Sequence, residues 1–408
     1  MSKKQVYDLA PYEFYIYEKK ELDDGNLLYC LEPTHDTNIC TVCGGKGIKH
    51  GITYRKVRDI PQGFIQVGLI IKTVRYQCKN CGATWVNDYA SIPSSSKMTD
   101  RMRTYIAGKS VISPFAEVAQ ELSVTDTTIK RAFREKIKEL DKENVTYSPE
   151  ILGIDENHLS GNYRAVFVDV EKRQLIEMLE QRSKQTVLTY LSSLPDKEKI
   201  KVVTMDMWNP YRSAVKEALP NATIVVDKFH VVKEFTGTLD KMRKDLIKKV
   251  PKDKKKYLKN NRFLLLSNKE DLTVANKKKL NDLLNKYDCL EKPYLLKEML
   301  RLMYMQPTKS DAESWLEGIR NMVNNNAELI AFKNVFKTLD NWHTEIFNYF
   351  DYNYTNASTE NLNKMINTIG NSGRGYSFEV LRAKALYKNK IPTYRKFDFP
   401  DEFKGDKQ

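Results

Sequence analysis

The chain has 408 residues and carries 67 Lys and Arg against 53 Asp and Glu, a formal net charge of +14 at pH 7. A hydrophobic content of 41% is that of a globular protein, long enough for two or more domains, and excludes a disordered tail. The basic surplus makes a polyanion, most simply nucleic acid, the first partner to consider, although a merely soluble basic protein can have the same composition.

Neither a secretory leader nor a membrane span is predicted. The first residues, MSKKQVYDLAPYEF, lack an apolar core, and no stretch approaches the roughly 18 continuous apolar residues that a spanning helix needs. We therefore expect a cytoplasmic protein without a membrane partner. Six cysteines in a chain of this length are too few for a disulfide framework, so metal binding is the better use for the paired ones.

Residues 1–95 are predicted to form a zinc-binding β module. The segment contains β-type runs such as 64–71 and ends in the polar stretch 94–97. It also contains two Cys-x-x-Cys pairs, each followed by a glycine, and two such pairs can complete a tetrahedral structural zinc site. Because 34 residues separate the pairs, we expect a β-meander to fold back between them. The four predicted zinc ligands are Cys40, Cys43, Cys78 and Cys81.

Two alternatives to this zinc site remain open from the sequence. The pairs could be unrelated turns with buried free thiols, or His35 or His50 could replace one sulfur. Cys30 and Cys289 lack a nearby partner and are predicted to be ordinary core residues. A site closed by four protein ligands has no open position, so we assign no catalysis to it.

Residues 96–149 are predicted to form a helix-turn-helix DNA-binding domain. Helical periodicity from 98 to about 140 breaks at Ser113-Pro114 and around 123–125, which fits three short helices. The buried face of the last helix is predicted to consist of Ile129, Phe133 and Ile137. The hydroxyls and cations on its outer face suit base edges and phosphates, and they are Thr127, Thr128, Lys130, Arg131 and Arg134. Similar patterns occur in proteins that never contact DNA, but the zinc module and the charge favour DNA binding.

A mixed α/β layer is predicted over residues 150–235. Apolar runs return at 151–154, 165–170, 175–179, 201–205 and 223–226, and helical stretches near 183–193 and 210–219 separate the last three. The runs ILGID and VVTMD end in Asp155 and Asp206, whose side chains can converge if the two strands are neighbours. An aspartate after a strand is usually only a turn residue, the role that we expect for Asp169, Asp227 and Glu156.

Beyond this layer, the pattern becomes helical. Residues 236–345 are predicted to be a basic helical segment, since 241–262 alone contains eleven Lys or Arg and only two Asp. In the final part, 346–408, capping residues at 356–359 precede a helix with the apolar stripe Leu362, Met365, Ile366 and Ile369. Its opposite face carries Glu360, Asn363, Lys364 and Asn367. Such a face suits a metal and a DNA backbone, although most such faces are simply solvated.

Several motifs together resemble the ISL-three family of bacterial insertion-sequence transposases. The most specific are DMWNPY, DKFH and YSFEVLRAK, and ILGIDE, STENLNKMIN and the cysteine pairs accompany them. The resemblance covers about residues 38–390, although Ser358-Thr359 departs from the family pattern before the third acid. It implies an α+β multidomain protein with an RNase H-like core, 150–235 and 346–408, that is interrupted by the helical insertion. It also implies that Asp155, Asp206 and Glu360 are the acidic catalytic triad.

The function implied by the resemblance is that of a DNA transposase. The protein would bind the terminal inverted repeats of an insertion sequence and cleave and transfer DNA strands into target DNA. Two Mg²⁺ or Mn²⁺ ions would be held by the triad and a structural Zn²⁺ by the cysteines. Lys364 and Arg374 would contact DNA, and His230 would lie beside the acids unless it only holds the start of a helix.

Two ends must be cut together, so a nucleoid-associated homodimer or larger homo-oligomer is expected. Two other functions remain open. One is a non-catalytic DNA-binding regulator built from the same zinc and helix-turn-helix modules. The other is an RNase H-type nuclease that cuts but does not join strands.

Overall fold

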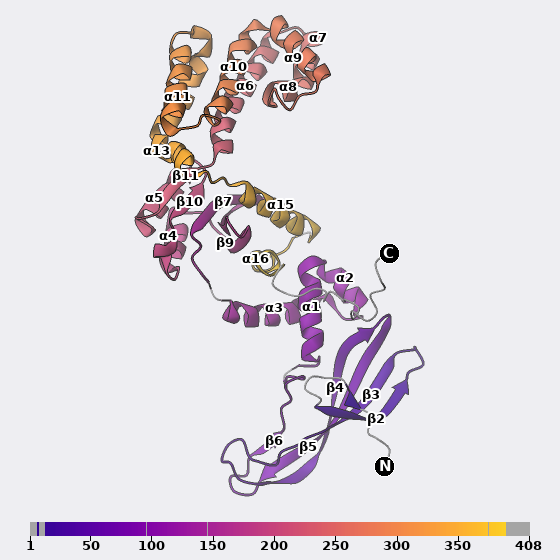
Figure 1. Cartoon of the computed structure of the whole chain (residues 1–408). Helices are drawn as coiled ribbons and strands as arrows, with labels where there is room; N and C mark the ends of the chain where they lie inside the picture. The colour runs from indigo at the N-terminus through magenta and orange to yellow at the C-terminus, as the bar shows by residue number, and fades with distance from the viewer. Residues whose placement is uncertain (1–5, 8–12, 95, 145, 374, 389–408) are drawn as a thin grey trace, which may run out of the picture. The chain divides into compact units, whose positions relative to one another are not determined.

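The computed structural model describes residues 6–7, 13–94, 96–144, 146–373 and 375–388 (Figure 1). The chain divides into two compact units, Met1–Val145 with Thr368–Gln408, and Thr146–Asn367. The division into five parts that the sequence suggests stays a prediction. Within the described residues, no helix combines the length and the apolar character that crossing a membrane requires.

The first unit contains a six-stranded sheet. Its strands are β1 (Val6–Tyr7), β2 (Phe14–Glu21), β3 (Leu27–Pro33), β4 (Gly47–Gln62), β5 (Ile65–Cys78) and β6 (Thr84–Val86). Across the sheet they lie in the order β1-β2-β3-β5-β4, and β6 pairs with β5. Alternate residues of β5, namely Val67, Leu69 and Ile71, are buried in one apolar cluster, as the period of a strand requires. Strands β4 and β5 are one long antiparallel hairpin. The predicted meander between the cysteine pairs is therefore wrong, because a single hairpin returns the chain.

The helices described in the first unit include α1 (Asp100–Ile112), α2 (Phe115–Glu121), α3 (Asp126–Glu143) and α16 (Phe378–Tyr387). Helices α1 to α3 occupy the predicted segment, and Thr125 caps α3 by accepting a hydrogen bond from the backbone N–H of Thr128. The fully buried Lys384 of α16 donates to the backbone oxygens of Ser110 and Ser113, the latter at 3.0 Å. The C-terminal helix thus satisfies carbonyls at the end of α1.

The second unit contains a five-stranded sheet of order β11-β10-β7-β8-β9. Its strands are β7 (Ile151–Leu159), β8 (Asn162–Asp169), β9 (Gln174–Leu179), β10 (Val202–Met205) and β11 (Thr223–Val226). Strands β7 to β9 form an antiparallel meander, whereas β10 and β11 run parallel to β7. All five predicted apolar runs are strands, and α4 (Lys184–Ser193) and α5 (Asn209–Ala218) are the two predicted helices.

Helices cover this sheet and form the rest of the unit (Figure 1). They are α6 (Lys228–Lys249), α7 (Lys252–Asn260), α8 (Arg262–Leu266), α9 (Val274–Lys286), α10 (Glu291–Met303), α11 (Lys309–Asn324), α12 (Lys333–Asn341), α13 (His343–Phe347), α14 (Tyr349–Tyr352) and α15 (Ala357–Ser372). Leu152 and Ile154 point into the main core, which includes residues of α4 to α6 and α10 to α13. Ile151 packs on the other face, near Tyr349.

The two unpaired cysteines differ in environment. Cys30 is buried in β3, as predicted, whereas Cys289 is exposed in a short turn after α9. The prediction of a core position for Cys289 is wrong, since the buried neighbour in that turn is Leu290.

Candidate carboxylate and zinc centres

Two parallel strands bring Asp155 and Asp206 to adjacent positions. Ile154 of β7 pairs with Met205 of β10, and the two aspartates are the next residues of each chain segment. Because side chains alternate along a strand, both aspartates lie on the face opposite to the Ile154 and Met205 core. The two strands are neighbours, which is the condition that the sequence set for the two side chains to converge.

Helix α15 packs closely on this face of the sheet. Gly153 of β7 makes the approach possible, since a Cβ atom there would lie 2.9 Å from Oγ1 of Thr359. The buried Asn356, directly before α15, accepts a hydrogen bond from Oγ1 of Thr204 at 2.8 Å and donates to the oxygen of Ile154 at 3.4 Å. The start of α15 is thereby fixed to both strands that carry the aspartates.

Part of the polar face of α15 turns toward β7. Nδ2 of Asn363 donates to Oδ2 of Asp155 at 2.8 Å, and Nδ2 of Asn157 donates to Oδ1 of Asn367 at 3.0 Å. Lys364, between them, is exposed. The sequence placed Asn363 on the correct face but gave no signal that its amide contacts a carboxylate.

Glu360 lies in the first turn of α15, one turn before Asn363 on the same face, and is partly buried. Its backbone N–H donates to the oxygen of Asn356 at 3.0 Å. The helix therefore points Glu360 along the same face as the amide that contacts Asp155. Among the described residues, the four cysteine sulfurs are the potential metal ligands that all lie within 4.8 Å of one another. The carboxylates of Asp155, Asp206 and Glu360 do not lie as close together as these sulfurs.

Asp155 carries its charge at an electrostatic cost, and Asp206 lies next to it. Asp155 is 8% exposed, and its burial together with the charge of Asp206 raises its pKa to about 7. Oδ1 of Asp206 is buried and has no hydrogen-bond partner among the described residues. A metal ion would relieve the repulsion between the two carboxylates, so the pair fits a metal ion in charge and in donor type.

His230, at the start of α6, supplies one positive group. Its Nδ1 lies 2.8 Å from Oδ1 of Asp206 and 3.8 Å from Oδ2 of Asp227, although the ring N–H does not point well enough for a hydrogen bond to Asp206. Burial of the imidazole opposes its protonation, but the carboxylates of Asp206 and Asp227 outweigh burial and raise the pKa of His230 to about 10. The structure thus brings His230 next to Asp206.

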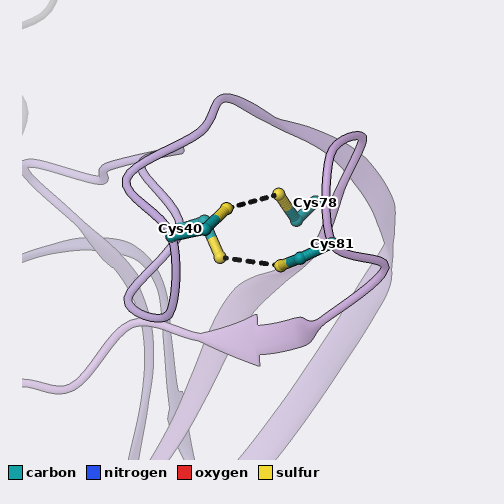
Figure 2. Close-up of side chains that lie close together, drawn as sticks. Cys40, Cys78 and Cys81 are labelled. Atoms are coloured by element: carbon teal, nitrogen blue, oxygen red, sulfur yellow. Dashed lines mark hydrogen bonds between the residues drawn. The ribbon is translucent and has the colours of Figure 1, made fainter.

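The four predicted cysteines form a second centre (Figure 2). Sγ of Cys40 lies 3.6 Å from Sγ of Cys81, Sγ of Cys43 lies 3.5 Å from Sγ of Cys78, and all four sulfurs are within 4.8 Å of one another. Tetrahedral Zn–S bonds of about 2.3 Å place sulfurs roughly 3.8 Å apart, so the quartet fits zinc. Backbone N–H groups of Cys81 and Asn80 lower the pKa of Cys78 to about 6, which favours the thiolate.

The two cysteine knuckles have matching backbones. Gly44 and Gly82 have φ of 71° and 72°, and their N–H groups donate to the backbone oxygens of Cys40 and Cys78. The glycine after each pair therefore allows the turn, as the sequence indicated. His35 and His50 are exposed and do not belong to the cluster, so neither replaces a sulfur.

Comparison with known proteins decides the family. Residues 152–385, more than half of the chain, match the model of the ISL-three family of DDE transposases, described as transposase. The chain belongs to the ISL-three transposase family. It is also 27% identical over 327 residues to the transposase for insertion sequence element IS1001 of Bordetella parapertussis, covering 77% of this chain and 80% of that protein. The resemblance seen in the sequence is confirmed, and membership of this family implies a transposase that acts on DNA and uses divalent metal.

The other acids of this transposase have separate roles. Asp227 caps α6, with Oδ1 3.4 Å from the N–H of Phe229, and Asp169 accepts hydrogen bonds from Tyr147 and Lys172 near a turn. Glu156 lies within β7, so its predicted role as a turn residue is wrong. Its carboxylate pairs with Arg182, whose guanidinium lies 4.0 Å from the ring centroid of Tyr163 and 4.7 Å from that of Trp208.

The predicted DNA-contacting residues of α3 lie mainly on its outer face. The exposed members are Thr127, Lys130, Arg131 and Arg134, and the predicted inner residues Ile129, Phe133 and Ile137 are buried. Thr128 is half-buried and contributes to the cap with Thr125, and Lys130 forms an ion pair with Asp126 at 2.6 Å. Arg374 lies outside the described residues.

Proposed function

We propose that the protein is a transposase that binds the terminal inverted repeats of an insertion sequence and catalyses metal-dependent strand cleavage and strand transfer. The observation that carries this proposal is the placement of Asp155 and Asp206 at the ends of adjacent parallel strands, under a helix that bears Glu360. The sheet, an antiparallel meander extended by two parallel strands, supports an RNase H-like core. The helical segment 236–345, which begins within α6 and ends within α13, is then the insertion.

In this proposal, Asp155, Asp206 and Glu360 hold two Mg²⁺ or Mn²⁺ ions. Bound ions would neutralise charge on the leaving oxygen and lower the pKa of an attacking water or 3′-hydroxyl. The chain's own contribution is orientation. The N–H of Glu156 donates to Oδ1 of Asp155 at 2.7 Å and Asn363 donates to Oδ2, so the carboxylate cannot rotate freely. His230 is an active-site neighbour that balances the charge of Asp206.

DNA recognition is assigned to the first unit. A structural Zn²⁺ in the cysteine quartet stiffens the tip of the sheet, and α3 is the recognition helix of a helix-turn-helix. Thr127, Thr128, Lys130, Arg131 and Arg134 contact the terminal repeats. Lys364 and Arg374 also contact DNA, and a homodimer or larger homo-oligomer brings two ends together.

The deciding experiment compares the wild type with Asp206→Asn. The substrate is duplex DNA that carries the element's own ends, taken from the sequence flanking the gene. We expect the variant to bind this duplex with unchanged affinity but to form neither nicked nor joined products in Mg²⁺. The matched control is Asp196→Asn, at an exposed ion pair with Lys199, which should cut and join normally.

Each alternative function predicts a different result. A regulator would bind the ends without cutting them in the wild type. A nuclease of the RNase H type would yield cut but not joined DNA. Cleavage by Asp206→Asn at the wild-type rate would contradict the assignment of the carboxylates.

A further inference from the structure

A concave surface in the first unit joins the sheet to the helix-turn-helix. Its volume is about 600 Å³, and residues of β3, β4 and β5 line one side while the turn before α3 and the first turns of α3 line the other. We call it the basic groove. Its charged lining residues are Lys56, Arg58, Lys97 and Arg131, and no acidic residue lines it.

The cations of the basic groove are available to a ligand. Lys56, Lys97 and Arg131 are exposed and form no ion pair with the described residues, whereas Lys130 on the neighbouring face of α3 is paired with Asp126. Another cavity on the same sheet, of about 420 Å³, contains Lys49 and Lys72 together with Glu32 and Asp36. The basic groove, unlike that cavity, has no acid in its lining. Its positive potential therefore favours a polyanion.

Arg58 locks the two walls of the groove together. Its guanidinium donates to the backbone oxygens of Ser123 and Leu122, both at 3.1 Å, and to Oε1 of Gln66 at 3.0 Å. Gln66 in turn donates to the oxygen of Glu121 at 3.1 Å. Strands β4 and β5 therefore hold the turn between α2 and α3, so the positions of Lys56 and Lys97 relative to α3 are fixed before any ligand binds.

The start of α3 adds to the positive potential of the groove. This helix has 18 residues, and the turn residue Thr125 and the first-turn residue Thr128 line the groove. The N-terminal end of a helix carries partial positive charge and favours an anion. Exposed cations on two walls, next to a helix that presents Arg131 and Arg134, suit an extended polyanion such as a DNA strand better than a small anion.

We propose that the basic groove binds the sugar-phosphate backbone of the DNA that α3 contacts, with Lys56, Lys97 and Arg131 each neutralising a phosphate. This inference rests on the proposed function, because it assumes that α3 faces DNA. It makes the zinc-bearing sheet and the recognition helix one rigid DNA-binding surface, in which the sheet fixes the register and α3 contacts base edges.

The test is the salt dependence of DNA binding by the full chain. Binding of the element-end duplex and of an unrelated duplex of equal length is measured by fluorescence anisotropy from low to moderate salt, for the wild type and for Lys56→Ala with Lys97→Ala. Each lost phosphate contact lowers the slope of log K against log salt by about 0.9. For the double variant we expect the slope to be smaller in magnitude by about two such steps. Its affinity for both duplexes should fall by the same factor, on the order of tenfold or more.

The matched control is Lys49→Ala, which removes a lysine from the same strand, β4, in the cavity that also contains acids. Its slope should equal that of the wild type. Unchanged slope and affinity in the double variant would overturn the groove assignment, and so would a loss confined to the element-end duplex, because backbone contacts do not depend on sequence. These outcomes are independent of catalysis. If the double variant shows the expected change of slope but the wild type never cuts DNA, only the proposed function is contradicted.

Discussion

Gly153→Ala tests whether α15 is seated on β7 as closely as the carboxylate centre requires. The added Cβ would lie 2.9 Å from Oγ1 of Thr359, 3.1 Å from Cγ2 of Val170 and 3.3 Å from Oδ1 of Asn356. Thr359 and Asn356 are almost completely buried, so neither can simply swing away. Overpacking of this kind costs about 1 to 3 kcal/mol, because the backbone or the helix must shift.

The expected effect has a stability part and an activity part. For a folding unit of this size, each kcal/mol lowers Tm by roughly 2 to 4 °C, so we expect a fall of about 2 to 12 °C. A shift of α15 also moves Glu360 away from the aspartates, and a misplacement near 1 Å can cost about 100-fold in rate. Binding of the terminal repeats through α3 and the zinc-bearing sheet should not change, since both lie in the first unit. Of the proposed DNA contacts, α15 carries Lys364.

The assay combines thermal unfolding with cleavage of the element-end duplex. Gly237→Ala is the matched control: Gly237 lies inside α6 with nothing within 4 Å of an added Cβ, so alanine there should stabilise by about 1 kcal/mol. Thr359→Ala combined with Gly153→Ala should be less destabilised than the sum of the single variants, because it removes the clashing oxygen. A Gly153→Ala protein with wild-type Tm and wild-type cleavage would refute the close packing of α15 on β7.

Three further predictions concern other parts of the chain. Asn363→Leu removes the hydrogen bond to Asp155, so the cleavage rate should fall about tenfold and cleavage should require more Mg²⁺, with unchanged DNA affinity. The control Asn361→Ala, at an exposed position of the same helix, should cleave like the wild type. Equal Mg²⁺ titrations of Asn363→Leu and the wild type would contradict this role. Cys40→Ser should lower the zinc content, measured by atomic absorption, from one ion per chain and weaken binding of the ends; undiminished zinc would exclude the site. Burial lowers the pKa of Lys384 from 10.5 to about 8, so the unfolded chain binds the proton of this lysine more tightly than the folded chain does. The stability of the wild type relative to Lys384→Met should therefore rise between pH 8 and 10. A difference in Tm that stays constant over this range would contradict the prediction.

Strand positions and the two aspartates were predictable because their signals are local. Runs such as ILGID and VVTMD are short, apolar and end in an acid, and the structure makes them the adjacent strands β7 and β10. The cysteine pairs were likewise predictable, since a knuckle and its glycine lie within five residues. Helix breaks at Ser113-Pro114 and near Ser123 also follow from local chemistry.

Contacts between distant residues could not be derived in the same way. Nothing near Asn363 indicates that its amide meets Asp155, 208 residues earlier in the chain. Gly153 looks like an ordinary strand glycine until Thr359 is placed against it. The hairpin between the cysteine pairs was mistaken for a meander because β4 and β5 are unusually long, with 16 and 14 residues, and periodicity alone does not fix strand length.

The most direct test of the catalytic assignment is anomalous diffraction from crystals of the protein bound to its element ends and soaked in Mn²⁺. We predict two manganese peaks about 4 Å or less apart, held by the carboxylates of Asp155, Asp206 and Glu360. Peaks held by the two aspartates with Glu360 turned away, or no peaks at this face of the sheet, would contradict the account.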